Sequence, residues 1–181
     1  MKTLFKVVGV IVVVLVVLLV IVRITGFDPG ECSTTPSWSC RLPGLWLRGN
    51  VANAPPADWS YTDKIAHLMI QTHTPYLLPV SVTADFALYN GNLYVESTYP
   101  AGVEYPNGRR WNGYLARDPR VRVKIGDQLF DGTMVYVTDP TEIQGVLQAK
   151  AKKYPAGGTG LFAPWKAPPL ERAFVFKIVP S

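Results

Sequence analysis

The most constraining feature of the sequence is an uninterrupted apolar run, Val7–Val22, that contains no charged residue. As a helix, this run is about 24 Å long, somewhat shorter than the ~30 Å hydrocarbon core of a bilayer. Flanking apolar residues lengthen it if Lys6 and Arg23 direct their charged ends into the headgroup layers. We therefore predict one membrane-spanning helix within residues 1–25. This excludes a purely cytosolic soluble enzyme, and the lack of a second such run excludes a polytopic transporter.

A cleaved signal peptide is the alternative interpretation of this run. Cleavage needs small residues in an A-x-A-like pattern after the apolar segment, and VRITGFDPGE contains none, which favours an uncleaved signal anchor. Lys2 and Lys6 precede the run, whereas Arg23 is soon followed by Asp28 and Glu31. The positive-inside rule then predicts a cytoplasmic N-terminus. We expect a single-pass protein of the bacterial inner (plasma) membrane, with its domain on the periplasmic or outer side.

Two cysteines, Cys32 and Cys40, lie in the stretch CSTTPSWSC, within a linker of residues 26–57 that is rich in Pro, Gly and Ser. In an oxidising compartment we predict that they form a local disulfide, which contributes ~2–3 kcal/mol by the loop-entropy model. Two free thiols are the alternative. A zinc site needs two more ligands nearby, and none occurs before His67.

The net charge of the chain is +5, but much of this excess belongs to the membrane segment. Of the 18 basic residues, Lys2, Lys6 and Arg23 flank the apolar run, and without them 15 basic residues face 13 acidic ones. The predicted export also separates the domain from nucleic acid. We therefore expect no nucleic-acid partner.

Alternating patterns and turn signals predict a mainly β domain with two short helices in residues 58–181. Asn90-Gly91 is typical of a type I′ hairpin turn. Asp139 is predicted to cap a helix that begins at Pro140, with Glu142 completing a capping-box-like pattern, and a shorter helix is predicted over Arg110–Ala116. The predicted strands are Ile65–Thr72, Val80–Tyr89, Asn92–Ser97, Val121–Ile125, Gln128–Thr138 and Ala173–Val179. Successive hairpins favour antiparallel pairing and closure into a small barrel.

No constellation of catalytic side chains is visible in this domain. The sequence lacks G-x-S-x-G, and GGTG at Gly157–Gly160 follows a helix instead of a strand, which indicates a flexible loop. His67 and His73 would be ~20 Å apart on one strand and cannot chelate one metal there. We therefore predict no catalytic residue and no metal site.

A cluster of basic residues between Arg109 and Lys124 is more informative. Arginines before a short helix can bind phosphate with two parallel hydrogen bonds, helped by backbone N–H groups at the helix start. Trp111 beside them could cover a planar ring. The alternative is a solvated basic face of a strand and a helix.

Four stretches, DWSYTD, NGNLYVES, RRWNGYLARDPRVRVKIGDQLFDG and TDPTEIQGVLQAKAKKYP, resemble a group of membrane-anchored proteins with a split β-barrel domain. That group is similar to the superfamily of deazaflavin-dependent nitroreductases and pyridoxamine-phosphate-oxidase-like flavin-binding proteins. The resemblance covers about Asp58–Val179 and implies a split antiparallel β-barrel after a single transmembrane helix. It also implies a cofactor site at Ser97, Thr98, Arg109, Arg110 and Trp111.

The sequence departs from the flavin-binding pattern at one turn. Where the relatives have a basic phosphate-binding turn, Thr72–Ser81 reads THTPYLLPVS, without Lys or Arg. We therefore favour a binding or accessory subunit that holds no cofactor, acts as a homodimer or as part of a membrane complex, and recognises its partner through the barrel mouth and the loop of Phe162 and Trp165. The alternative is an oxidoreductase that uses FMN or deazaflavin on quinone-like or nitro substrates at the membrane.

Overall fold

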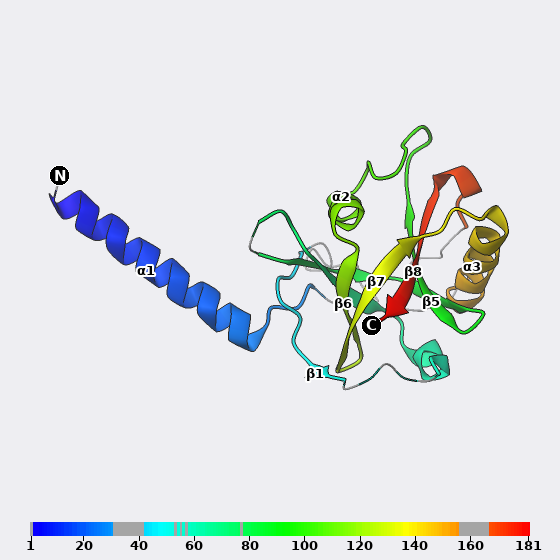
Figure 1. The fold of residues 1–181 in the computed structure, drawn as a ribbon, viewed down its shortest axis with the longest axis horizontal. Coiled ribbons are helices and arrows are strands. Elements are labelled where there is room, and N and C mark those ends of the chain that lie inside the picture. The colour runs from blue at the N-terminus through cyan, green and yellow to red at the C-terminus, as the bar shows by residue number, and fades with distance from the viewer. Residues whose placement is uncertain are drawn as a thin grey trace.

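The computed structural model describes residues 2–30, 42–52, 54, 56, 58–76, 78–155 and 167–181 of the chain. Figure 1 shows a long N-terminal helix, α1, followed by a curled sheet with two further helices packed on it. The helices are α1 (Lys2–Thr25), α2 (Arg110–Arg117) and α3 (Pro140–Lys153). The strands are β1 (Asn50–Val51), β2 (Leu68–Thr72), β3 (Val80–Ala84), β4 (Phe86–Tyr89), β5 (Asn92–Thr98), β6 (Arg120–Ile125), β7 (Gln128–Tyr136) and β8 (Ala173–Pro180).

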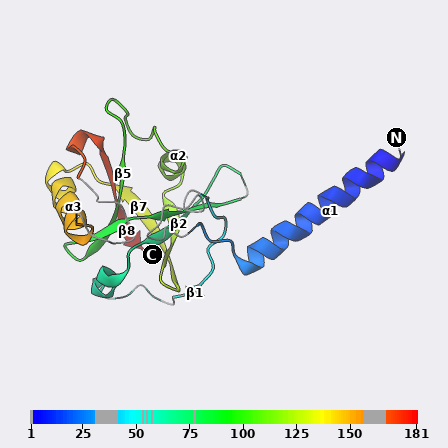
Figure 2. The same cartoon turned by 180° about the vertical axis from the view of Figure 1, so that it is seen from behind.

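The predicted apolar helix is present as α1, and it points away from the barrel in both views (Figures 1 and 2). None of its residues is buried in the fold. Its 24 residues span about 36 Å at 1.5 Å per residue, and an 18-residue window has a mean hydropathy of 3.4. By length and composition, α1 can cross a bilayer.

The strands form one sheet in the order β3-β2-β6-β7-β8-β5-β4, with every pair along this path antiparallel. The short β1 adds a parallel pair to β7. The two ends of the path, β3 and β4, are separated in sequence only by Asp85. Leu68 pairs with Ala84 on one side of this bend, and Phe86 pairs with Val95 on the other. The sheet therefore curls into the predicted split barrel, with Asp85 at the closure.

Several of the predicted elements are confirmed. Asn90 and Gly91 both have positive φ, 47° and 73°, as a type I′ turn requires. In β6, Val121, Val123 and Ile125 are buried while the alternate residues point outward. The strand predicted over Val80–Tyr89 is broken into β3 and β4, because its halves pair with different neighbours.

Two clusters of apolar residues hold the domain together. One fills the barrel interior and includes Phe86, Val123 and Phe176. The other lies between α3 and the outer face of the sheet, where Val146 and Leu147 pack near Val175.

The predicted start of α3 is confirmed in part. Asp139 caps the helix, as predicted, since its carboxylate accepts a hydrogen bond from the Thr141 N–H at 3.0 Å. The capping-box prediction for Glu142 is wrong. Its carboxylate instead accepts a hydrogen bond from the Tyr94 hydroxyl at 2.6 Å, which ties α3 to β5.

The described parts of the linker after α1 are attached to the barrel. The Phe27 N–H donates to the Trp46 carbonyl at 2.7 Å. The Asp28 carboxylate accepts from the Arg48 N–H at 2.8 Å and pairs with Lys124 Nζ at 2.6 Å. These contacts join the end of α1 to β6. Cys32, Cys40, Phe162 and Trp165 lie outside the described residues, so the disulfide and the recognition loop remain predictions.

Candidate functional site

Four of the five predicted cofactor-binding residues line one cavity of about 350 Å³. Ser97 and Thr98 end β5, while Arg109 and Trp111 flank the start of α2. Arg110 is exposed and does not line this cavity. The remaining lining residues are Val82, Thr83, Ala84, Asp85, Glu96 and Lys150. We call this space the α2 cavity.

The floor of the α2 cavity holds a buried ion pair that the sequence reasoning missed. Lys150 Nζ from α3 lies 2.8 Å from Glu96 Oε2, and the two side chains are only 4% and 2% exposed. Thr98 donates its hydroxyl hydrogen to the same carboxylate. Asp85 lies 3.6 Å from Lys150 Nζ. Burial raises the pKa of Asp85, and the neighbouring ammonium of Lys150 opposes that rise in part.

The hydroxyl groups of the cavity are also engaged inside the protein. Ser97 donates to the Tyr99 hydroxyl at 3.0 Å, and burial raises the pKa of Tyr99. Trp111 packs against Phe176 at a ring-centroid distance of 5.4 Å and a tilt of 51°. The indole therefore has a fixed position at the cavity wall, where it can cover a planar ligand.

These residues do not fit a flavin phosphate. Arg109 and Lys150 supply two cations, and Asp85 and Glu96 supply two carboxylates, so the lining has no net positive charge. Lys150 is already paired, and the hydroxyls of Ser97 and Thr98 are committed to neighbours. A phosphate dianion would face two carboxylates with Arg109 as its principal donor. The α2 cavity suits an uncharged planar ring better.

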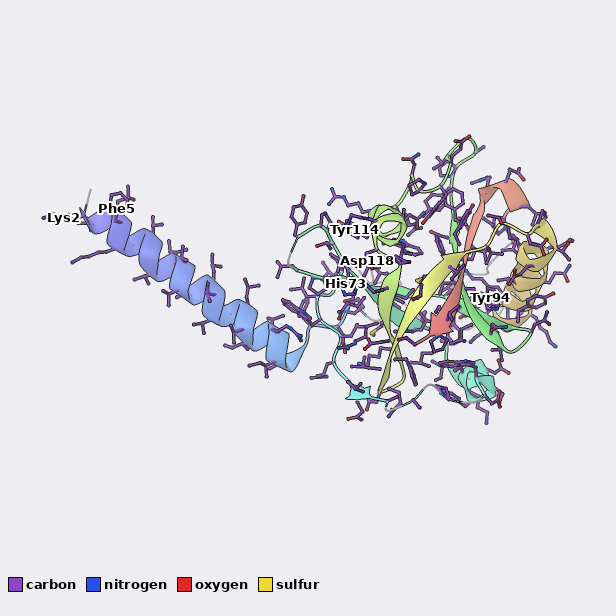
Figure 3. The ribbon with its side chains drawn as sticks, viewed as in Figure 1. Lys2, Phe5, His73, Tyr94, Tyr114 and Asp118 are labelled. Carbon is purple, nitrogen blue, oxygen red and sulfur yellow. The ribbon has the colours of Figure 1, made fainter. Side chains whose placement is uncertain are left out.

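The turn that corresponds to the relatives' basic turn lies elsewhere, between β2 and β3. His73, Thr74, Tyr76 and Pro79 of this turn line a different cavity of about 510 Å³, together with Arg23 at the end of α1. Figure 3 shows His73 beside Asp118 on the side of the barrel nearer α1, with Tyr94 on the opposite side near α3. The resemblance implies that this turn and the residues Ser97, Thr98, Arg109 and Trp111 bind one phosphate together. In this chain they line two separate cavities.

Neither histidine shows the geometry of a metal ligand set. Within the described ranges, no three His, Cys, Asp or Glu side chains are grouped so that they could hold a metal ion. His73 Nδ1 lies 3.0 Å from the Arg120 carbonyl. Burial lowers the pKa of His67 to about 4, with Lys153 adding to the effect. Among the described residues, neither histidine therefore belongs to a cluster that could hold a metal ion.

No protein-family model and no curated protein sequence match the chain. Solved structures do. A conserved hypothetical protein from Mycobacterium tuberculosis superposes with a TM-score of 0.50 at 17% identity, over 74% of this chain and 86% of the other. An F420 reductase gives 0.49 at 17% identity over 70% and 95% of the two chains. A 5-nitroimidazole antibiotic resistance protein from Bacteroides thetaiotaomicron gives 0.48 at 17% over 67% and 76%. At such identities the likeness concerns the fold, and the chain has the split β-barrel fold that its sequence predicted.

Proposed function

We propose that the chain is a single-span membrane protein whose split barrel binds a small uncharged ligand and carries no catalytic residue of its own. The observation that carries this proposal is the charge balance of the α2 cavity, where two cations and two carboxylates neutralise one another beside the Trp111 ring. A ring of quinone or flavin size without a phosphate can stack on the indole and leave this balance intact. In this role the barrel is a binding or accessory subunit of a membrane complex.

The anchoring part of the proposal is supported by α1 and by the linker. Lys2 and Lys6 sit at the N-terminal end of the helix, which favours a cytoplasmic N-terminus and a barrel on the exported side. The Asp28–Lys124 ion pair at 2.6 Å keeps the barrel close to the end of the helix. Retention of the full chain in membranes after carbonate washing, with the barrel digested by protease added to spheroplasts whose inner membrane is intact, is the expected result. A barrel that is digested only after the inner membrane is permeabilised would contradict the topology.

A comparison of riboflavin with FMN tests the binding role. The two molecules share the ring and differ in the phosphate, so a cavity without a phosphate clamp should bind them with affinities within about threefold. Purified full-length protein is also expected to be colourless in the visible range. Binding of FMN more than about tenfold tighter than riboflavin, or copurification of FMN, would contradict the proposal.

Arg109 and Arg110 provide a matched pair for this experiment. They are neighbours of the same charge, but only Arg109 lines the α2 cavity. Arg109→Gln should change riboflavin and FMN binding equally, and Arg110→Gln should change neither. A selective loss of FMN affinity in Arg109→Gln would show that a phosphate contact exists.

A second candidate is the oxidoreductase that uses a flavin or a deazaflavin. It is favoured by the convergence of Ser97, Thr98, Arg109 and Trp111 on one cavity. The missing phosphate donors would then have to come from a second copy of the chain. A dimer in sedimentation or light-scattering measurements, together with FMN-selective binding, would support this candidate against the first.

A further inference from the structure

We propose that the cavity at the end of α1 binds the phosphate headgroup of an anionic phospholipid from the leaflet that the barrel faces. This inference rests on the membrane anchoring proposed above and is independent of the ligand of the α2 cavity. We call this space the α1 cavity. It measures about 510 Å³, and among its lining residues are Arg23, Trp46, His73, Tyr76 and Arg120.

The position of the α1 cavity follows from Arg23. This residue lies in the last turn of α1, which is the end of the apolar segment. If α1 spans the bilayer, its last turn lies at the depth of the headgroups. The Arg23 guanidinium is 5.5 Å from the centre of the Trp46 ring, so the indole holds the cation at the mouth of the cavity. A lipid phosphate at this depth can reach Arg23 without leaving the membrane.

The charges of the α1 cavity differ from those of the α2 cavity. Arg120 makes two hydrogen bonds to Asp118, at 2.9 and 2.7 Å. Arg122 makes two to Asp131, at 2.7 and 2.8 Å. Arg23 pairs with no carboxylate among the residues that the structure describes. Its donors are therefore available to an external anion, whereas the carboxylates of Asp118 and Asp131 are already paired with Arg120 and Arg122.

The turn that contributes Tyr76 to the α1 cavity also exposes large apolar side chains. Tyr76 is 76% exposed and Leu78 is 38% exposed, both in the β2–β3 turn. Figures 1 and 2 show this turn on the side of the barrel that faces α1. Tyrosine and tryptophan prefer the interface between headgroups and acyl chains, where an apolar ring and a polar tip are both accommodated. Tyr76 and Trp46, which line the same cavity as Arg23, are suited to that depth.

A lipid phosphate explains these features better than a soluble anion does. A soluble anion site needs no exposed Tyr76 and Leu78, which cost free energy in water. The same turn lacks Lys and Arg, so the cation of the site that is unpaired in the described part of the chain is Arg23 of α1, the helix that is proposed to span the membrane. The group that the site would recognise is a phosphate ester with a single negative charge.

The test uses the full chain reconstituted in bilayers of phosphatidylcholine alone or of phosphatidylcholine with phosphatidylglycerol. After mild extraction, native mass spectrometry counts the phosphatidylglycerol that stays bound. We expect the wild-type protein to retain it and Arg23→Gln to lose it by about tenfold, since one charge-assisted contact of this kind is worth about a factor of ten. Hydrogen exchange in residues 73–76 should slow when phosphatidylglycerol is present.

Arg48→Gln is the matched control, because Arg48 is an exposed arginine at the same end of the barrel that does not line the α1 cavity. It should retain phosphatidylglycerol within about twofold of wild type. Equal losses in both variants would overturn the inference and leave only general surface attraction. Displacement of the lipid by inorganic phosphate alone would also overturn it, in favour of a soluble anion. Loss of the whole protein from carbonate-washed membranes would instead contradict the proposed anchoring.

Discussion

Replacing Lys150 by Met tests the buried ion pair on which the interpretation of the α2 cavity depends. Lys150 and Glu96 are 2.8 Å apart and nearly inaccessible to water. Methionine fills most of the lysine volume but leaves the Glu96 carboxylate buried without its counter-ion. Removal of one partner of a buried ion pair typically costs about 3–5 kcal/mol. We expect the free energy of unfolding to fall by that amount.

A double variant distinguishes the ion pair from ordinary packing. Glu96→Leu combined with Lys150→Met replaces the whole pair with apolar side chains, and such replacements are often close to neutral. Asp85 stays in place, 3.6 Å from the lost ammonium, so the recovery is expected to be incomplete. Adding Asp85→Asn removes that remaining carboxylate and should recover more of the stability.

Urea unfolding of the full chain in detergent micelles, followed by tryptophan fluorescence, measures these differences. With a slope of about 2 kcal/mol per molar, a loss of 3–5 kcal/mol lowers the midpoint by roughly 2 M. Lys152→Met is the control, since this lysine is on the same helix but exposed, and it should change stability by less than about 0.5 kcal/mol. A loss below about 1 kcal/mol in Lys150→Met, or a double variant no more stable than the single one, would refute the reasoning.

Three further predictions concern backbone strain and buried ionisable groups. Gly108 has φ near +100° and faces the Tyr99 ring, so Gly108→Ala should lower the free energy of unfolding by about 2 kcal/mol in thermal unfolding. Gly113 lies in open space on α2, so Gly113→Ala should raise it by about 0.5–1 kcal/mol. Equal effects of the two substitutions would contradict this reasoning. Burial lowers the pKa of His67 from 6.5 to about 4 in the folded chain, so the unfolded chain binds the proton first as the pH falls. The free energy of unfolding should therefore fall between pH 6.5 and pH 4. This fall should be smaller in His67→Leu. Burial lowers the pKa of Lys153 to about 8, so one methylated-lysine NMR signal, absent in Lys153→Arg, should titrate there and not near 10.5.

Much of the fold was predictable because its signals are local. The Asn90-Gly91 turn, the alternation of β6 and the Asp139 cap each depend on a few neighbouring residues, and each is confirmed. The break at Asp85 is not local. Both halves of Val80–Tyr89 have strand-like sequences, and only pairing with β2 and β5, which are far apart in the sheet, forces the bend.

The candidate site was predictable only in part, for a similar reason. The resemblance identified Ser97, Thr98, Arg109 and Trp111, which the structure gathers in one cavity. It could not identify Lys150 and Glu96, because their contact joins α3 to β5 across 54 residues. One signal was present. Lys150 occupies the next position of the apolar stripe that contains Val146 and Leu147, and a lysine on such a stripe indicates a buried cation in need of a carboxylate.

The proposed lipid site does not require a basic turn between β2 and β3. β3 runs between them, since Pro79 lines the α1 cavity and Val82–Ala84 line the α2 cavity. The α2 cavity is electrically balanced, whereas the α1 cavity includes Arg23, whose partner in the described structure is an aromatic ring. The proposed phosphate site therefore lies on the side of β3 that faces α1, and it depends on a residue of that helix. A barrel detached from α1 would lose that cation, so its affinity for anionic lipid should depend on α1 while its affinity for an uncharged ring should not.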